Sequence, residues 1–153
     1  MDFVQDFPTI LAKDLISFVT GKKLGVGIGR TVYEWRFDPK YVLKVESTSM
    51  SFQNVREYEI WQEIQYRKDI AKWFAPCDWI SPCGIYMLQR KTERIPECEY
   101  PKKVPSFFFD QKYGNFGVIM EKGKRRFVAH DYGTFSLTNG LTVRMKKADW
   151  YRE

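Results

Sequence analysis

The feature that most constrains the fold is a cluster of closely spaced glycines that runs directly into a strand. Residues 25–29 read GVGIG, and residues 30–36 alternate and are rich in β-branched and aromatic side chains, as strands are. Closely spaced glycines let the backbone approach phosphate oxygens and donate its amide groups to them. A dinucleotide-binding fingerprint requires a helix directly after its glycines, and a Walker-type loop requires Gly-Lys-Ser/Thr; the sequence here has neither. Two interpretations remain, a glycine-rich hairpin that folds over phosphates and an ordinary flexible turn.

A lysine stands in the next predicted strand. Residues 41–46, YVLKVE, follow a turn signal at Asp38-Pro39, so the two strands are expected to form a hairpin. In this strand Lys44 shares a face with Val42 and Glu46. A lysine on a solvated face is the ordinary case, whereas a buried lysine requires a carboxylate or a phosphate as its partner.

The remaining periodicity predicts an α+β fold whose strands are mainly antiparallel. Thr9 is a candidate cap for the first helix, and Gly21 is a candidate stop. The last twenty residues have a weak pattern. The other predicted elements are helices over 9–20 and 52–70, strands over 77–81 and 84–89, a connector over 91–105, a short apolar run over 106–109, a hairpin of 118–120 with 125–129 around Gly123, and a strand over 141–145.

Composition restricts the class of protein without choosing a partner. A chain of 153 residues fits one domain, and 25 Lys and Arg against 19 Asp and Glu give a net charge of +6, which favours anionic partners. Three cysteines and a single histidine argue against a disulfide-stapled fold and against a structural zinc site, so we expect reduced thiols that serve in packing. The N-terminal residues are not typical of a signal peptide, and no apolar run approaches the length of a membrane span, so a cytoplasmic protein is expected.

Five segments, in chain order, resemble the motifs of protein kinases. LGVGIGRTVYE at 24–34 resembles the glycine-rich loop, and VLKVE at 42–46 resembles the strand that carries the phosphate-binding lysine. REYEIWQEI at 56–64 is similar to the helix that supplies the partner of this lysine. DQKYGN at 110–115 resembles the catalytic loop, and HDYG at 130–133 is similar to the metal-binding triplet. The resemblance covers roughly residues 22–135 and implies a kinase-like fold.

The resemblance assigns roles to individual residues. Lys44 would hold the α- and β-phosphates of ATP, and Glu57 would hold Lys44, with Glu59 in its place if the helix were shifted by two residues. Asp110 would act as base. The other implied roles are a charge for the γ-phosphate from Lys112, Mg²⁺ ligation by Asn115 and Asp131, and nucleotide binding by Gly25, Gly27, Gly29, Val32, Leu88 and Gln89.

The sequence also departs from the kinase pattern. Arg30 stands where the family has its third glycine, either to help with phosphate or to fill space, and Phe108-Phe109 replace the usual His-Arg before the catalytic aspartate. Too few residues separate the hinge near 88–90 from Asp110, and too few follow Gly133, to build the large helical lobe. We therefore expect one truncated domain over 1–153: a kinase-like N-lobe of antiparallel sheet plus helix at about 22–90, and a minimal catalytic β-hairpin at about 106–135.

Three functions are compatible with these observations. The first is an ATP- and Mg²⁺-dependent phosphotransferase, a small protein Ser/Thr kinase or an autokinase. The second is a pseudokinase that binds a nucleotide or a protein partner. The third, supported by charge and aromatic content alone, is a basic nucleic-acid-binding protein. The missing lobe further suggests a homodimer that covers the exposed apolar surface, and the economy of the chain suggests a bacteriophage protein acting in the cytoplasm of its bacterial host.

Overall fold

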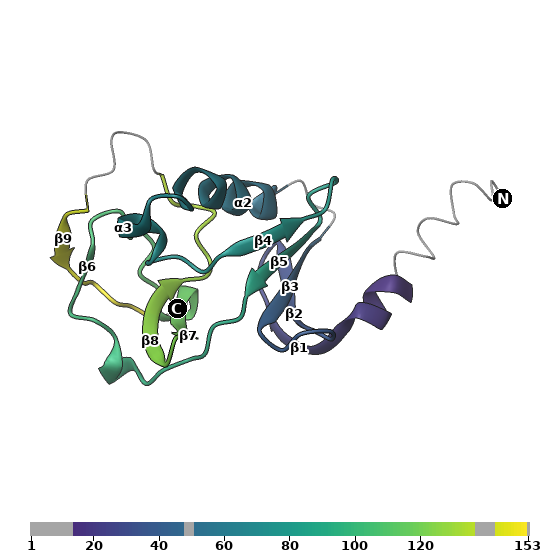
Figure 1. Ribbon diagram of the computed structural model, residues 1–153, viewed down its shortest axis with the longest axis horizontal. Coiled ribbons are helices and arrows are strands. Elements are labelled where there is room, and N and C mark those ends of the chain that lie inside the picture. Colours follow the sequence, from purple (N-terminus) through teal and green to yellow (C-terminus); the bar gives the residue numbers. More distant parts are fainter. Residues whose placement is uncertain (1–13, 48–50, 137–142, 153) are drawn as a thin grey trace.

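The centre of the protein is a five-stranded antiparallel sheet (Figure 1). The computed structural model describes residues 14–47, 51–136 and 143–152. The strands stand in the order β1-β2-β3-β5-β4. Their bounds are β1 Thr20–Val26, β2 Arg30–Trp35, β3 Tyr41–Glu46, β4 Cys77–Ile80 and β5 Tyr86–Arg90. The hairpin expected from residues 30–36 and 41–46 is confirmed, and so are the two strands expected over 77–81 and 84–89, the second of which begins two residues later at Tyr86.

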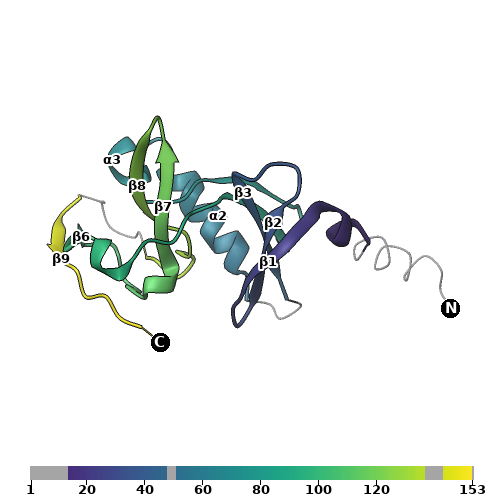
Figure 2. The same cartoon turned by 90° about the horizontal axis from the view of Figure 1, so that it is seen from below.

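The register of the sheet decides which side chains share a face. Lys44 lies opposite Val32 on β2 and opposite Met87 on β5. Arg30 lies two residues before Val32 and Gln89 two residues after Met87, so both share the face of Lys44. Helix α2, Gln53–Ile64, packs against this face, and in Figure 2 it lies between the pair β7–β8 and the strands β1–β3.

Two helix predictions need correction. The single helix expected over 52–70 is two helices, α2 and the short α3, Lys68–Ala71. Ile64 and Ile70 are both buried in one core, whereas a continuous helix would turn residues six apart by about 120° away from each other. In the first predicted helix, residues 14–19 are helical but Thr20 already begins β1, so Gly21 lies in a strand and does not stop the helix. Thr9 and the start of that helix fall outside the described residues.

The second half of the chain forms two small antiparallel pairs. Strand β7, Phe116–Glu121, and strand β8, Lys124–Ala129, make the expected hairpin. Its turn places Lys122 at φ 50° and Gly123 at φ 75°, the left-handed conformation that two-residue hairpin turns need. The connector over 91–105 contains more structure than expected, namely the 3₁₀ turn η1 Glu97–Glu99 and strand β6 Lys103–Pro105.

Strand β6 pairs with β9, Met145–Lys147, near the end of the chain. The strand expected over 141–145 is therefore shifted: residues 141–142 lie outside the described residues, and 143–144 are not in a strand. Backbone hydrogen bonds from Ser106 to Arg144 and from Ala148 to Lys102 bracket this pair and fix its register. The apolar run at 106–109 is a turn with Phe107 and Phe108 buried.

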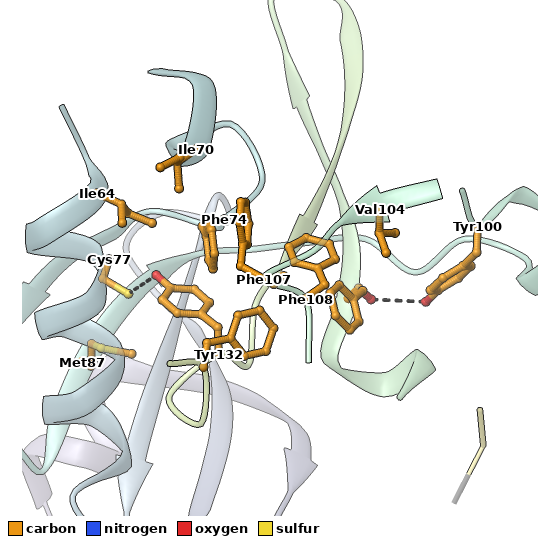
Figure 3. Close-up of a cluster of buried hydrophobic side chains, with 13 residues drawn as sticks. Ile64, Ile70, Phe74, Cys77, Met87, Tyr100, Val104, Phe107, Phe108 and Tyr132 are labelled. Carbon is orange, nitrogen blue, oxygen red and sulfur yellow. Dashed lines mark hydrogen bonds between the residues drawn. The ribbon is translucent and has the colours of Figure 1, made fainter. Parts of the chain in front are cut away.

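An aromatic core joins the two halves (Figure 3). Phe74 is fully buried, and its ring contacts those of Phe107, Phe108 and Tyr132 at centroid distances of 5.7, 6.1 and 4.9 Å. The Tyr132 hydroxyl lies 3.1 Å from the Cys77 sulfur and donates to the Ala75 carbonyl at 2.8 Å. The packing role expected for the cysteines thus holds for buried Cys77 but not for Cys83 and Cys98, which are exposed. Among the described residues, no helix combines the length and the apolar character needed to cross a membrane.

Candidate functional site

The carboxylate of Glu57 on α2 is the centre of a buried polar network. It is fully buried and accepts four hydrogen bonds. Its Oε1 accepts from Lys44 Nζ at 2.5 Å and from Gln89 Nε2 at 3.0 Å. Its Oε2 accepts from Arg30 Nη2 at 2.9 Å and from the Tyr132 backbone N–H at 3.2 Å. Residues from three strands, a helix and the loop after β8 therefore meet at one carboxylate.

Electrostatics keep this carboxylate ionised. Burial alone would raise the pKa of Glu57, but the charges of Arg30 and Lys44 and their hydrogen bonds outweigh burial and lower the pKa to about 2. Glu59, the alternative partner for Lys44, is exposed on the same helix. The structure thus pairs Lys44 with Glu57, in the helix register that the sequence favours.

Lys44 is buried between the sheet and the loop that follows β8. Besides Glu57, its ammonium donates to the backbone carbonyl of His130. The solvated-face interpretation of Lys44 is therefore wrong, since only 3% of this residue is exposed. A buried ammonium with a carboxylate partner is what the alternative required.

Arg30 occupies the middle of the site. Its guanidinium donates to Asp131 Oδ1 at 2.6 Å and to Asn54 Oδ1 at 3.1 Å, in addition to Glu57. The contact with Asp131 bridges residues 101 positions apart in the chain. Burial would lower the pKa of Arg30, but Glu57 and then Asp131 raise it above its ordinary value. Arg30 and Lys44 against Glu57 and Asp131 make a cluster of two cations and two anions whose charges balance.

Asn54 holds the start of α2 against the sheet. Its side-chain amide donates to the carbonyls of Lys44 at 3.2 Å and Ile85 at 2.8 Å. Its own backbone N–H donates to Glu46 Oε1 at 2.5 Å, so a carboxylate of β3 caps a helix whose N-cap residue, Phe52, has no polar side chain. This bracing sets the position of Glu57 three residues later.

A second cluster forms at the base of the β7–β8 hairpin. Asn115 Nδ2 donates to Asp110 Oδ2 at 3.0 Å, and the Asn115 carbonyl accepts from the backbone N–H of Asp131 at 3.3 Å. The hairpin thus brings residues 115 and 131 side by side, as its chain reversal predicts. Lys112 is half-buried just before the 3₁₀ turn η2, Tyr113–Asn115, and its backbone bridges to Tyr151.

The carboxylate of Asp131 and the amide oxygen of Asn115 are hard ligands of the type that Mg²⁺ takes. However, Arg30 already neutralises Asp131. Within the described residues, no three side chains of His, Cys, Asp or Glu gather as a metal site would require. A divalent cation at this site would therefore compete with Arg30 for the Asp131 carboxylate.

The residues expected to bind the nucleotide differ in the space around them and in the face of the sheet on which they lie. An added Cβ would meet no atom within 4 Å at Gly25 and only the Arg30 carbonyl, at 3.7 Å, at Gly27, so the backbone there can be approached closely. At Gly29 it would stand 2.9 Å from Ser51 Oγ and Gln53 Nε2, so this glycine serves packing. Val32 shares the face of Lys44, whereas Leu88 lies opposite Leu43 on the other face.

His130 is held by contacts from both of its ring nitrogens. Its Nδ1 lies 2.7 Å from Thr92 Oγ1, and its Nε2 lies 2.8 Å from the Gly114 carbonyl. Because a carbonyl only accepts, Nε2 carries the proton and Nδ1 accepts from the threonine hydroxyl in the neutral ring. Burial and then the charge of Lys44 lower the pKa of His130 to about 4.

Three contributors to the site were missed by sequence reasoning. Asn54 carries one usable signal, since it lies one helical turn before Glu57 and so on the same face. The partners of Arg30 and the placement of Tyr151 depend on chain segments far apart and carry no local signal. No family model matches this sequence, and no curated protein matches it, so the geometry alone supports the interpretation below.

Proposed function

We propose that this protein is an ATP-dependent phosphotransferase with a truncated kinase-like architecture, acting as a protein Ser/Thr kinase or on itself. The observation that carries the proposal is the buried Lys44–Glu57 pair with Asp131 joined to it through Arg30. Lys44 is held by a carboxylate on one face of the sheet, and the glycine-rich segment joins two strands of the same sheet. An ammonium and backbone amides of this kind can both donate hydrogen bonds to phosphate oxygens.

The residues divide the work of phosphoryl transfer between positioning and charge. Among the described residues Lys44 donates to two acceptors, Glu57 and the His130 carbonyl, and an ammonium has three N–H bonds, so one can serve a phosphate oxygen. Asp110, held by Asn115, would accept the proton of the acceptor hydroxyl. Mg²⁺, when bound, would neutralise phosphate charge, and Asn115 and Asp131 are the residues to hold it.

A second candidate function is binding of a nucleotide without transfer, as in a pseudokinase. Two contacts favour it. Arg30 already balances the charge of Asp131, and the Tyr151 hydroxyl already donates to Asp110. The same Arg30 could then bind phosphate directly and make the metal unnecessary. A nucleic-acid-binding role has no support from the site, because its cationic side chains are buried and paired.

Measurement of ADP formation from Mg²⁺-ATP tests the first function. Lys44→Met removes the phosphate-binding charge but leaves Glu57 its bonds from Arg30, Gln89 and Tyr132, so the fold should persist. We expect a loss of turnover of at least about 100-fold, whereas the exposed Lys40→Met should retain the wild-type rate. If Lys44→Met forms ADP at the wild-type rate, Lys44 has no part in the reaction.

Titration of Arg30→Met with ATP, with Mg²⁺ and with EDTA, separates the two candidates. If Arg30 competes with the metal, this variant should bind Mg²⁺-ATP about 10-fold more tightly, a gain of about 1.4 kcal/mol. If Arg30 binds phosphate, the variant should bind ATP more weakly, and EDTA should not affect wild-type binding. The exposed Arg56→Met is the matched control.

A homodimer remains part of the proposal. Several exposed apolar side chains could contribute to it, among them Val26 and Ile28 at the glycine-rich turn and the contacting pair Phe18–Phe37. Sedimentation equilibrium at micromolar concentration measures the mass in solution, and a monomer throughout would exclude the homodimer.

A further inference from the structure

The end of the chain lies along the loop that carries Asp110. The backbone N–H of Tyr151 donates to the Gln111 carbonyl at 3.1 Å, and the Tyr151 carbonyl accepts from the Tyr113 N–H at 3.1 Å. Residue 151 therefore pairs with Lys112 like one residue of a parallel strand. A segment in this position follows the catalytic loop as an extended substrate would.

The side chain of Tyr151 completes this arrangement. Its hydroxyl donates to Asp110 Oδ1, while the other oxygen of the same carboxylate accepts from Asn115 at 3.0 Å. The tyrosine is still 46% exposed, so a second molecule can contact this residue. Asn115 in turn accepts from the backbone of Asp131, which binds Arg30. Hydrogen bonds thus connect the phenol to the cluster around Lys44 and Glu57.

Neighbouring residues hold Tyr151 in place. The indole of Trp150 packs against Phe116 at 5.0 Å and Tyr113 at 6.0 Å, and it donates to the Pro101 carbonyl at 2.8 Å. The backbone N–H of Asp149 donates to Gln111 Oε1 at 2.6 Å. Because the tail is anchored just before Tyr151, the phenol is presented to Asp110 at little further entropic cost.

We propose that Tyr151 is the built-in phosphate acceptor, a site of autophosphorylation within one chain; this rests on the proposed phosphotransferase function and selects its autokinase form. The Tyr151 oxygen attacks the γ-phosphorus of ATP and forms a P–O bond. The bond from the γ-phosphorus to the β–γ bridging oxygen breaks, and its electron pair leaves with ADP. The phenolic proton passes to Asp110, the carboxylate that already accepts it as a hydrogen bond.

The product has a built-in consequence. A phosphotyrosine carries about two negative charges, and these would stand beside the Asp110 carboxylate. Repulsion between them should loosen the tail and expose the Asp110 loop. The phenol has a single hydroxyl, so at most one phosphate per chain is expected at this position.

The test uses the full-length chain with Mg²⁺ and γ-labelled ATP, and mass spectrometry to locate the label. We expect one phosphate on Tyr151, introduced with a first-order rate constant that does not change with protein concentration. Tyr151→Phe keeps the ring and the backbone contacts, and it should incorporate at least about 100-fold less label than the wild type. Tyr66→Phe removes the hydroxyl of a tyrosine that is 86% exposed and should label as the wild type does. Thermal melting shows that both variants fold.

Four other outcomes would overturn the inference, and each points to a different explanation. If the wild type transfers phosphate to added casein but leaves Tyr151 unlabelled, the phosphotransferase function stands and the acceptor assignment fails. If transfer to casein increases in Tyr151→Phe without any label on Tyr151 in the wild type, the tyrosine is an inhibitory cap. If labelling of Tyr151 accelerates with protein concentration, the reaction occurs between chains. If the chain neither binds ATP nor forms ADP, both proposals fail.

Discussion

At the scale of single residues, the burial of Glu57 makes the stability of the fold sensitive to its charge. Its carboxylate balances two buried cations, Arg30 and Lys44. Glu57→Gln keeps the shape but removes the charge, and Lys44 is then left buried without its anion. Breaking a buried pair in this way costs about 3–5 kcal/mol. Urea unfolding should show this loss in the free energy of unfolding.

Glu59 provides the matched control on the same helix. It is exposed, so Glu59→Gln should change the free energy of unfolding by less than about 0.5 kcal/mol. Equal effects of the two substitutions would mean that Glu57 is not the centre of the network, and a larger effect at Glu59 would mean that α2 is shifted by two residues.

His130 should make the free energy of unfolding depend on pH. Its pKa falls from 6.5 to about 4 on folding, so between these values the unfolded chain binds a proton that the folded chain does not. The free energy of unfolding is therefore highest above pH 6.5 and decreases as the pH falls toward 4. We expect a decrease of about 1–2 kcal/mol between pH 7 and pH 5.

Because the chain has a single histidine, His130→Gln isolates this contribution. Glutamine can still meet Thr92 and the Gly114 carbonyl, and it does not titrate. Its unfolding curves in urea should be nearly independent of pH between 7 and 5. Glu57 does not interfere, since its pKa falls from 4.5 to about 2 and its contribution is lost below pH 4.5. An unchanged slope in His130→Gln would assign the effect to other groups.

At the scale of elements, a glycine in the β7–β8 turn and a glycine of β1 near the tip of the β1–β2 hairpin should behave in opposite ways. Gly123 has φ 75°, so Gly123→Ala should cost about 1 kcal/mol of stability and leave ATP affinity unchanged. Gly25 lies near the tip of the β1–β2 hairpin without a left-handed φ, and an added Cβ has open space. Gly25→Ala should therefore leave stability equal or higher by up to about 1 kcal/mol, but under the proposed function it should weaken ATP binding, because the added Cβ would stand in the path of the phosphates.

Both variants are tested in two ways. Calorimetric titration with ATP measures the affinity, and unfolding in urea measures the stability. If Gly25→Ala binds ATP as the wild type does, the glycine-rich segment is an ordinary turn, the alternative that the sequence left open.

Elements with a local signal were predictable, and those that depend on distant partners were not. Strand β3 and the β7–β8 hairpin follow from alternation and a glycine turn within a few residues of each other. Strand β6 has no such signal, because Val104 pairs with Lys146 near the other end of the chain. In the site, the Lys44–Glu57 pair followed from the resemblance. The Arg30–Asp131 ion pair could not be predicted, because it joins residues 101 positions apart in the chain.

At the scale of the whole molecule, the aromatic core decides whether the chain unfolds as one unit. The core includes Ile64 of α2, Met87 of β5 and Phe116 of β7, so the sheet and the hairpin bury their apolar faces in the same cluster. The backbone adds a link, since Phe74 bridges to Ala129 at the end of β8. A cluster shared in this way should couple the two halves.

Phe74→Ala tests this coupling. Its ring is fully buried and contacts residues on both sides of the core, so its removal should cost about 3–5 kcal/mol. If the chain is one domain, hydrogen exchange should show the same loss of protection for the amides of β3 and of β7. Phe37→Ala is the control, because that ring is 58% exposed and its loss should change protection little. Protection lost in β7 but kept in β3 would divide the molecule into two units, and the site between Glu57 and Asp131 would then open without unfolding the sheet.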